Sequence, residues 1–236
     1  MTAAEAVEVW RADLDPPARI HEQLALLLST EEQETAGRFW KGSDARRFTA
    51  AHGYLRLLLS RRLGVAPEDL EFAPGPAGKP RLVGCGSDND LRFNLSHSGD
   101  VLLVALARGR EVGIDVERID TGFDWDQLAR TYFSTGERAA VARQTGRARM
   151  LSCFEIWTRK EALLKAIGSG IGGDLATVDV MGGSDVLTGA WTLQSIDLGS
   201  DYRAAIAAQG HNVPINPPAD IAIPDAWSAD AANRNF

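Results

Sequence analysis

The sequence predicts a protein of the α+β class, in which helices and antiparallel strands occupy separate stretches of the chain. Apolar runs of strand length come in neighbouring pairs joined by a short polar turn, as at residues 101–107 and 111–119. Helical periodicity is concentrated in long segments, near residues 44–63 and 152–167. A doubly wound parallel sheet would instead alternate single strands with single helices.

The start of the chain predicts one strand followed by three helices. Alternating apolar residues favour a strand at 7–14, and helical spacing favours a helix at 20–28. The SxxE pattern at residues 29–32 is typical of a capping box, which would open the next helix. We expect the third helix to be capped by Ser43 or Asp44 and to end at a glycine, Gly64.

The middle of the chain predicts loops and a hairpin. The proline- and glycine-rich segment at residues 73–82 favours a loop. A strand is expected at 91–95 and a turn at 96–100. The apolar run at 101–107 predicts a buried strand, and 111–119 its return strand across a tip at Gly109 and Arg110.

The last part of the chain predicts three helices and three strands. Helices are expected at 124–131, 134–143 and 152–167, a glycine-rich loop at 168–173, and strands at 175–181, 189–197 and 201–208. A break near residue 110 divides the chain into two α+β regions, 1–110 and 111–210. The proline-rich tail at 211–236 is expected to be irregular, either disordered or packed along one region.

Composition and charge exclude several classes of protein. No run approaches the roughly 20 apolar residues of a membrane helix, and the N-terminus lacks the basic and apolar regions of a signal peptide. We therefore expect a cytoplasmic protein. The formal net charge of −7 and the absence of a long basic stripe argue against nucleic-acid binding. Cys85 and Cys153 form no metal-binding pattern, so we expect both to be small buried residues.

Two carboxylates stand in the return strand at residues 111–119. Side chains alternate along a strand, so Asp115 and Glu117 share one face, roughly 6–7 Å apart, while Ile114 and Val116 take the other. Carboxylates this close repel one another unless a cation lies between them or water surrounds both. Taken alone, this segment favours the solvated face of an edge strand.

A second acidic position lies on the long helix at 152–167. Residues four apart share a helix face, so Trp157, Glu161 and Lys165 form one row. The alternative is an ordinary surface pair of glutamate and lysine, which stabilises a helix by only a few tenths of a kcal/mol.

Two further segments carry groups that suit phosphate. His97 stands between Ser96 and Ser98, where hydroxyls, imidazole and turn amides can bind phosphate oxygens. A turn with a hydrogen-bonded histidine explains that segment equally well. Lys79 precedes Pro80 in a stiff turn that would present one lysine, which alone is weak evidence.

Together these segments are consistent with one magnesium site. Asp115, Glu117 and Glu161 supply three hard oxygen ligands, which magnesium prefers alongside water and substrate phosphate. Lys79, Lys165 and nearby donors would bind the remaining phosphate oxygens. This set of groups suits attack at phosphorus in a pyrophosphate.

The paired motifs GIDVE (113–117) and WTRKEALLK (157–165), separated by roughly 40 residues, resemble the signature of the Sfp-type 4′-phosphopantetheinyl transferases. Shorter matches in the expected order extend the resemblance over about residues 5–208: RFWKGSDARRF (38–48), GKP (78–80), FNLSHSG (93–99) and GSGIGG (168–173).

The resemblance implies a monomer of two similar lobes in a pseudo-twofold arrangement, with coenzyme A in the cleft between them. It implies transfer of phosphopantetheine from coenzyme A to a serine of an acyl or peptidyl carrier protein, with release of 3′,5′-ADP. The implied metal ligands are Asp115, Glu117 and Glu161, the implied catalytic residues Glu161, Lys165 and His97, and the implied coenzyme A contacts Arg47, Lys79, Pro80, Ser96, His97 and Lys165.

Three other interpretations stay open. A coenzyme A-binding module without activity would share the fold, and an interaction scaffold would make the clustered charges incidental. A different magnesium-dependent phosphotransferase is a third, although the sequence has no Walker or kinase motif. Phe123 and Trp125 could form an apolar docking surface, but core packing of both is favoured.

Acidic residues at 31–34 replace the basic ones usual in the family, so Arg47 and Arg38 would carry more of the phosphate contact.

Overall fold

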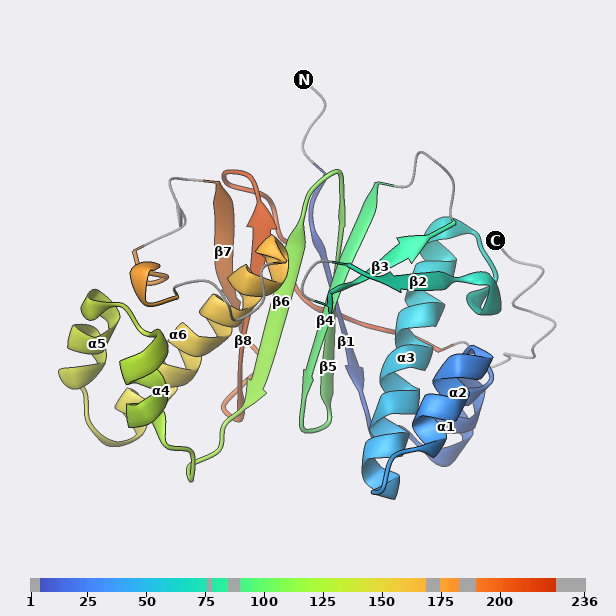
Figure 1. Ribbon diagram of the computed structural model, residues 1–236, viewed down its shortest axis with the longest axis horizontal. Coiled ribbons are helices and arrows are strands. Elements are labelled where there is room, and N and C mark those ends of the chain that lie inside the picture. Colours follow the sequence, from blue (N-terminus) through green and yellow to red (C-terminus); the bar gives the residue numbers. More distant parts are fainter. Residues whose placement is uncertain (1–4, 76–77, 85–89, 169–174, 183–189, 224–236) are drawn as a thin grey trace.

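The computed structural model describes residues 5–75, 78–84, 90–168, 175–182 and 190–223. The α+β class is confirmed, because the strands form antiparallel sheets and the helices lie in separate layers on either side (Figure 1). No helix in these ranges is long and apolar enough to span a membrane.

The N-terminal half, residues 8–108, combines one main sheet with three helices. Its elements are β1 (Glu8–Asp13), α1 (Ala18–Ala25), α2 (Thr30–Gly37), α3 (Gly42–Leu63), a 3₁₀ turn at Pro67–Asp69, β2 (Glu71–Pro74), β3 (Pro80–Val83), β4 (Leu91–Ser98) and β5 (Val101–Arg108). The main sheet has the order β4-β5-β1-β9, and β2 and β3 form a separate hairpin.

The described part of the C-terminal half, residues 112–209, has a strand, three helices, a 3₁₀ turn and two strands, which is the order of the first half without its β2–β3 hairpin. Its elements are β6 (Val112–Arg118), α4 (Trp125–Tyr132), α5 (Thr135–Ala142), α6 (Gly146–Ile167), a 3₁₀ turn at Leu175–Thr177, β7 (Trp191–Ile196) and β8 (Tyr202–Gln209). Its sheet has the order β6-β8-β7, which corresponds to β1-β5-β4 in the first half.

Three apolar layers stabilise this arrangement. In each half the long helix packs on its own sheet, α3 through residues such as Leu55 and Leu58, and α6 through residues such as Ile156 and Leu163. A third layer joins the two sheets and includes Ile114 of β6. The two halves therefore share a continuous interior in the middle of the molecule (Figure 1).

The long helices end in the same way. Both α3 and α6 have 22 residues and stop at a glycine with a left-handed backbone, Gly64 (φ 65°) and Gly168 (φ 72°). The end expected for α3 is confirmed. Its start is not: the N-cap is Lys41, without a side-chain hydrogen bond, rather than Ser43 or Asp44.

The shorter helices begin with matching capping boxes. The expected box of Ser29 and Glu32 is confirmed at the start of α2, and Ser134 and Glu137 form an equivalent box at the start of α5. In both boxes the serine hydroxyl accepts from the glutamate N–H, and the glutamate carboxylate accepts from the serine N–H.

Each capping-box glutamate also binds a cation from the long helix behind it. Arg56 of α3 lies 2.5 Å from Glu32, and Lys160 of α6 lies 2.9 Å from Glu137. Each cation also donates to backbone carbonyls around the following 3₁₀ turn. The side chains of Lys160 and Glu137 are fully buried, and pairing makes such burial tolerable.

Four sequence-based expectations need correction. The segment at 73–82 is not one loop, because β2 and β3 pair across it. β4 extends to Ser98, so the residues at 96–98 belong to a strand. β6 pairs with β8 rather than returning along β5. The expected strand at 175–181 begins as a 3₁₀ turn, and residues 169–174 lie outside the described ranges.

The described part of the tail returns to the N-terminal half. Val7 bridges to Ile215, and β9 (Ala219–Asp220) pairs in parallel with β1. Ile221 is buried in the N-terminal core, whereas Val213 lies in the layer between the sheets and its N–H donates to Thr192 of β7. Of the two alternatives for this segment, packing along one region therefore holds for residues 215–221.

Gly113 lets α6 approach β6 closely. A Cβ atom at this position would lie 2.2 Å from the carbonyl oxygen of Ala162 and 2.3 Å from the amide nitrogen of Ala166. No side chain fits at such distances. The glycine therefore places the C-terminal part of α6 directly against the strand that carries Asp115 and Glu117.

Candidate active site

The alternation predicted for β6 is confirmed. Ile114 and Val116 enter the apolar layer between the sheets, whereas Asp115 and Glu117 face α6. Asp115 is only 3% exposed and Glu117 is half-buried, so this is not the solvated face of an edge strand. Two carboxylates at this depth need either partners or a cation.

α6 brings a lysine and a third carboxylate to this face. The Lys165 Nζ atom lies 2.6 Å from Asp115 Oδ1 and 3.0 Å from Ser96 Oγ. Glu161 lies one helical turn before Lys165, close enough for the charges of Asp115, Glu117 and Lys165 to act on it. The structure therefore brings together three carboxylates and one ammonium group from two elements.

Burial raises the pKa of all three carboxyl groups. For Glu117 and Glu161, burial is the largest cause, and the negative charge of Asp115 raises each pKa further. For Asp115, burial outweighs the opposing effect of Lys165. One lysine thus compensates the cluster only in part, and an additional cation would stabilise it.

Two carboxylate oxygens in this cluster lack a hydrogen-bond partner although they are buried. They are Asp115 Oδ2 and Glu161 Oε1. Buried polar atoms normally find a partner, and an orphaned atom calls for an explanation such as an ion. Hard carboxylate oxygens are the ligands that magnesium prefers.

The donor set fits a divalent cation in chemistry but is not preassembled. Within the described ranges, no three His, Cys, Asp or Glu side chains already stand in positions to hold a metal ion. The Lys165 ammonium lies against Asp115 and neutralises it in part. Binding of a metal ion would therefore require the carboxylates to converge and Lys165 to shift.

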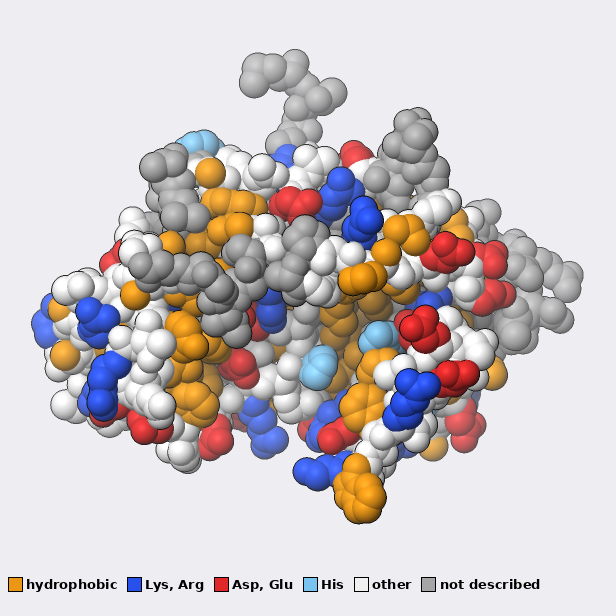
Figure 2. Space-filling model, viewed as in Figure 1, with side chains coloured by type: hydrophobic (Ala, Val, Ile, Leu, Met, Phe, Trp, Pro, Cys, Tyr) orange, Lys and Arg blue, Asp and Glu red, His pale blue; other side chains and the backbone are white. Residues whose placement is uncertain are grey.

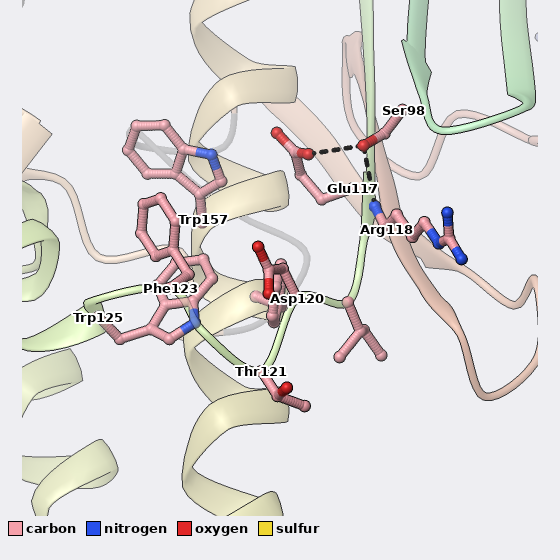
Figure 3. A pocket seen from close by; sticks show the side chains of 10 residues that line it. Ser98, Glu117, Arg118, Asp120, Thr121, Phe123, Trp125 and Trp157 are labelled. Atoms are coloured by element: carbon pink, nitrogen blue, oxygen red, sulfur yellow. Dashed lines mark hydrogen bonds between the residues drawn. The ribbon is translucent and has the colours of Figure 1, made fainter.

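β4 supplies two serine hydroxyls to the carboxylates. Ser96 Oγ donates to Asp115 Oδ1 at 3.0 Å. Ser98 Oγ donates to Glu117 Oε2 at 3.0 Å (Figure 3). Ser96 also accepts from Lys165 and from the Val116 N–H, which fills its hydrogen-bonding capacity. Sequence reasoning did not select Ser98 because it placed residues 96–100 in a turn, whereas in β4 the two-residue spacing puts Ser96 and Ser98 on one strand face.

His97 lies on the opposite face of β4. It alternates with the two serines and shares the side of Phe93, which packs into the N-terminal core. Although its ring reaches the surface, partial burial lowers its pKa, and the positive charges of Lys165 and His52 lower it further. The neutral imidazole is therefore favoured at neutral pH.

Arg47 and Lys79, both expected at coenzyme A, already have acidic partners. Arg47 donates to Asp100 at 2.9 and 3.0 Å, in the turn after β4. Lys79 donates to Glu111 at 3.0 Å and to the Val112 carbonyl at 2.9 Å, at the start of β6.

These two cations stand at opposite ends of β4. Arg92, near the start of β4, shares the Glu111 partner of Lys79, whereas Asp100 follows the end of the strand. Six residues of strand separate Arg92 from Ser98, roughly 20 Å. The structure therefore does not bring Arg47 to the same place as Lys79 and Pro80, which border a second pocket with Arg92 and Phe93.

A pocket of about 570 Å³ opens beside Glu117, the one carboxylate of the cluster that borders it. Ser98 from the first half and Glu117 from the second half border it, and Trp157 and Phe123 form its apolar wall (Figure 3). Trp125 is 9% exposed and belongs to the core, as expected, but Phe123 is 49% exposed, so that expectation fails for Phe123. In the space-filling view, histidine and acidic side chains reach the surface between the two halves (Figure 2).

Family models match both halves of the chain. Residues 13–108 match the model described as 4′-phosphopantetheinyl transferase, N-terminal. Residues 111–209 match the model described as 4′-phosphopantetheinyl transferase superfamily.

Individual proteins agree with these matches. The 4′-phosphopantetheinyl transferase HetI of a Nostoc species is 34% identical, over 88% of this chain and 89% of its own. A putative 4′-phosphopantetheinyl transferase of a Synechocystis species is 35% identical, over 72% and 68%. The crystal structure of Thermotoga maritima holo-[acyl-carrier-protein] synthase overlaps 43% of this chain and 64% of its own at 17% identity, with a TM-score of 0.35.

Proposed function

The chain belongs to the 4′-phosphopantetheinyl transferase superfamily, and on that premise we propose that it moves phosphopantetheine from coenzyme A to a serine of an apo acyl or peptidyl carrier protein. The reaction releases 3′,5′-ADP and depends on magnesium. We expect the enzyme to be monomeric and cytoplasmic, as the family resemblance and the sequence suggest.

One observation carries this proposal. Asp115 Oδ2 and Glu161 Oε1 are buried carboxylate oxygens without a hydrogen-bond partner. They belong to a cluster beside a pocket that both halves border. A substrate that enters this pocket would meet a place where a divalent cation is favoured.

Asp115, Glu117 and Glu161 would hold the magnesium ion. When bound, magnesium would offset the negative charge of the coenzyme A pyrophosphate and of the departing 3′,5′-ADP. Lys165, now bonded to Asp115, would turn its ammonium group toward the pyrophosphate and stabilise the same charge.

Glu161 would accept the proton of the carrier serine. A carboxylate is a sufficient base for this step when proton transfer is late, as in a loose phosphoryl-transfer transition state. The serine oxygen would bond to the β-phosphorus while the bond between that phosphorus and the bridging oxygen breaks. The electron pair leaves with 3′,5′-ADP.

The remaining contacts are expected at separate ends of β4. His97, favoured in its neutral form, would donate one ring N–H to a phosphate oxygen. Ser96 could do so only by giving up its bond to Asp115. Lys79 and Pro80 would border one part of coenzyme A, and Arg47 another part at the far end of the strand.

Intact-mass spectrometry of an apo carrier protein tests the proposal. With this protein, coenzyme A and magnesium, the carrier should gain the mass of one phosphopantetheine, and chelation of magnesium should abolish the gain. Glu117→Gln should also abolish it. Glu155→Gln is the matched control. Glu155 pairs with Arg159 on α6, outside the carboxylate cluster, so this change should leave transfer intact.

The alternatives give different results. If fatty-acid, polyketide and peptide carriers all stay unmodified while coenzyme A binds, the interpretation as an inactive binding module gains support. Release of a nucleotide other than 3′,5′-ADP would instead indicate a different phosphotransferase.

A further inference from the structure

The two halves meet along β4 and β6, which are linked by side chains rather than by a backbone ladder. The backbone partners of these strands are β5 and β8. Three side chains of β4 accept from successive outward N–H groups of β6. The bonds are Ile114 N–H to Asn94 Oδ1 at 2.8 Å, Val116 N–H to Ser96 Oγ at 3.4 Å, and Arg118 N–H to Ser98 Oγ at 3.0 Å.

We call these three bonds the side-chain ladder. Each bond joins residues twenty apart, so both strands advance by two residues per bond and run in the same direction. An edge strand buried without partners would leave these N–H groups unsatisfied, at a cost in free energy. The ladder satisfies them while keeping the strands too far apart for direct pairing.

Two of the three ladder residues make a further bond that the third does not. The Ser96 and Ser98 hydroxyls each donate to the carboxylate one position before the N–H that they accept from, Asp115 and Glu117 respectively. Figure 3 shows both bonds of Ser98. At the equivalent place opposite Asn94 the chain has Gly113, which offers no carboxylate. Asn94 thus performs the backbone function alone.

The N–H bond fixes the direction of each hydroxyl. A serine hydroxyl has one proton to donate, and accepting from a rigid backbone N–H commits its lone pairs on that side. At Ser98 the proton is then aimed at Glu117 Oε2. Ser98 thus fixes the direction of Oε2, and the Trp157 side chain is a second hydrogen-bond partner of the same carboxylate.

We propose that Ser98 is a positioning residue for Glu117: by holding Oε2, it fixes the orientation in which the carboxylate meets the divalent cation, so that the ladder aligns the metal site of one half against the other half. This rests on the proposed function, which makes Glu117 a metal ligand. Ser98 isolates the effect better than Ser96, because Ser96 also contacts Lys165. Groups that hydrogen-bond to metal ligands typically change affinity by about 10- to 100-fold.

Binding of Mn²⁺ to the full-length protein tests the inference without any turnover. Titration followed by electron paramagnetic resonance would give the Mn²⁺ affinity, since Mn²⁺ prefers the same oxygen ligands. Ser98→Ala should weaken Mn²⁺ binding about tenfold. Its melting temperature should stay close to that of the wild type, because the Arg118 N–H is exposed and water can replace the hydroxyl.

Two further variants separate positioning from folding. Ser98→Thr keeps the hydroxyl and should restore the affinity. Asn94→Ala removes the acceptor of a buried N–H and should lower the melting temperature by several degrees, while Mn²⁺ affinity stays within about twofold of the wild type.

Each outcome decides between the two roles. Unchanged Mn²⁺ affinity in Ser98→Ala would overturn the inference and leave Ser98 with a backbone role only, as would failure of Ser98→Thr to restore a lost affinity. A wild type that binds no Mn²⁺ would overturn the metal site and this inference together. A wild type that binds Mn²⁺ but transfers no phosphopantetheine would remove the proposed function, while the variants would still test Ser98.

Discussion

The two halves repeat the same framework, yet chemistry gathers in only one of them. Leu57 and Glu161 both lie seven residues before the left-handed glycine that ends their helix, but Leu57 is a buried core residue. The strand faces differ likewise: β1 turns Trp10 and Ala12 toward α3, where β6 turns Asp115 and Glu117 toward α6. The site thus occupies positions that the other half uses for its hydrophobic core.

What the halves share is structural. The capping-box glutamate and its buried cation recur at matching places, Arg56 and Lys160 each eight residues before the terminal glycine. Because this pair occurs in the half without the carboxylate cluster as well, we interpret it as a fixture of the fold. Substitutions at matching positions can therefore separate loss of function from loss of stability.

Substitution at the matching helix positions, Leu57 and Glu161, should give the largest difference between the two halves. Glu161→Gln removes the proposed base and should lower turnover on the order of 10³-fold, with coenzyme A binding retained. Leu57→Ala opens a cavity in the N-terminal core and should lower the free energy of unfolding by about 2–5 kcal/mol, with turnover of the folded protein kept. Carrier modification rates, calorimetric binding of coenzyme A and urea unfolding measure these effects. Near-normal turnover in Glu161→Gln would contradict the assignment.

Removing the buried cations should give a smaller difference between the halves. Lys160→Met leaves the fully buried Glu137 without its charge partner and should lower the free energy of unfolding by about 3 kcal/mol or more. Arg56→Met should lower it by about 2 kcal/mol, because Glu32 keeps its bond to His52 and is partly exposed. Thermal melts of both variants check this order.

A compensating substitution serves as the control. Adding Glu137→Leu to Lys160→Met removes the unpaired charge and should recover much of the lost stability. If the two single variants lose equal stability, the difference in burial between the pairs does not matter energetically.

The pH dependence of the free energy of unfolding should have opposite signs in the two halves. We expect this effect to be smaller than those of the substitutions above. The pKa of Glu32 is lowered from 4.5 to about 2: burial opposes the shift, but bonds to His52 and Arg56 outweigh it. Its contribution, about 2 kcal/mol after allowance for partial exposure, is present above pH 4.5 and is lost as the pH falls through about 2. Glu32→Gln should remove this loss in urea unfolding at low pH.

Glu161 should behave in the opposite way when metal is absent. Its pKa is raised, so its contribution is present below the ordinary glutamate value and is lost as the pH rises through the folded value. Metal-free Glu161→Gln should therefore be more stable than the wild type at neutral pH. If the wild type is more stable than Glu161→Gln, the negative charge of the carboxylate cluster is already compensated without metal.

Local signals in the sequence predicted much of this structure. Helical spacing found α3 and α6, the SxxE pattern found the start of α2, and strand alternation placed Asp115 and Glu117 on one face. These features depend on residues close together in the chain, where periodicity and capping rules apply.

The features that the sequence did not predict depend mainly on contacts between distant parts of the chain. Nothing near β6 in the chain shows that its partner is β8, some ninety residues later, rather than the adjacent β5. The separation of Arg47 from Lys79 likewise follows from how the strands stack. The hairpin of β2 and β3 was not predicted for another reason: the prolines where β2 ends and β3 begins are typical of loops.

The return of the tail to β1 has a consequence for biosynthesis. The C-terminal half is contiguous in the chain, so it can begin to fold as soon as it leaves the ribosome. The N-terminal sheet must wait for β9 and Ile221, about 200 residues after β1. At typical elongation rates of about 5–20 residues per second, the first-made strand keeps an open edge for roughly 10–40 s. The half that is synthesised second is thus able to complete its fold first.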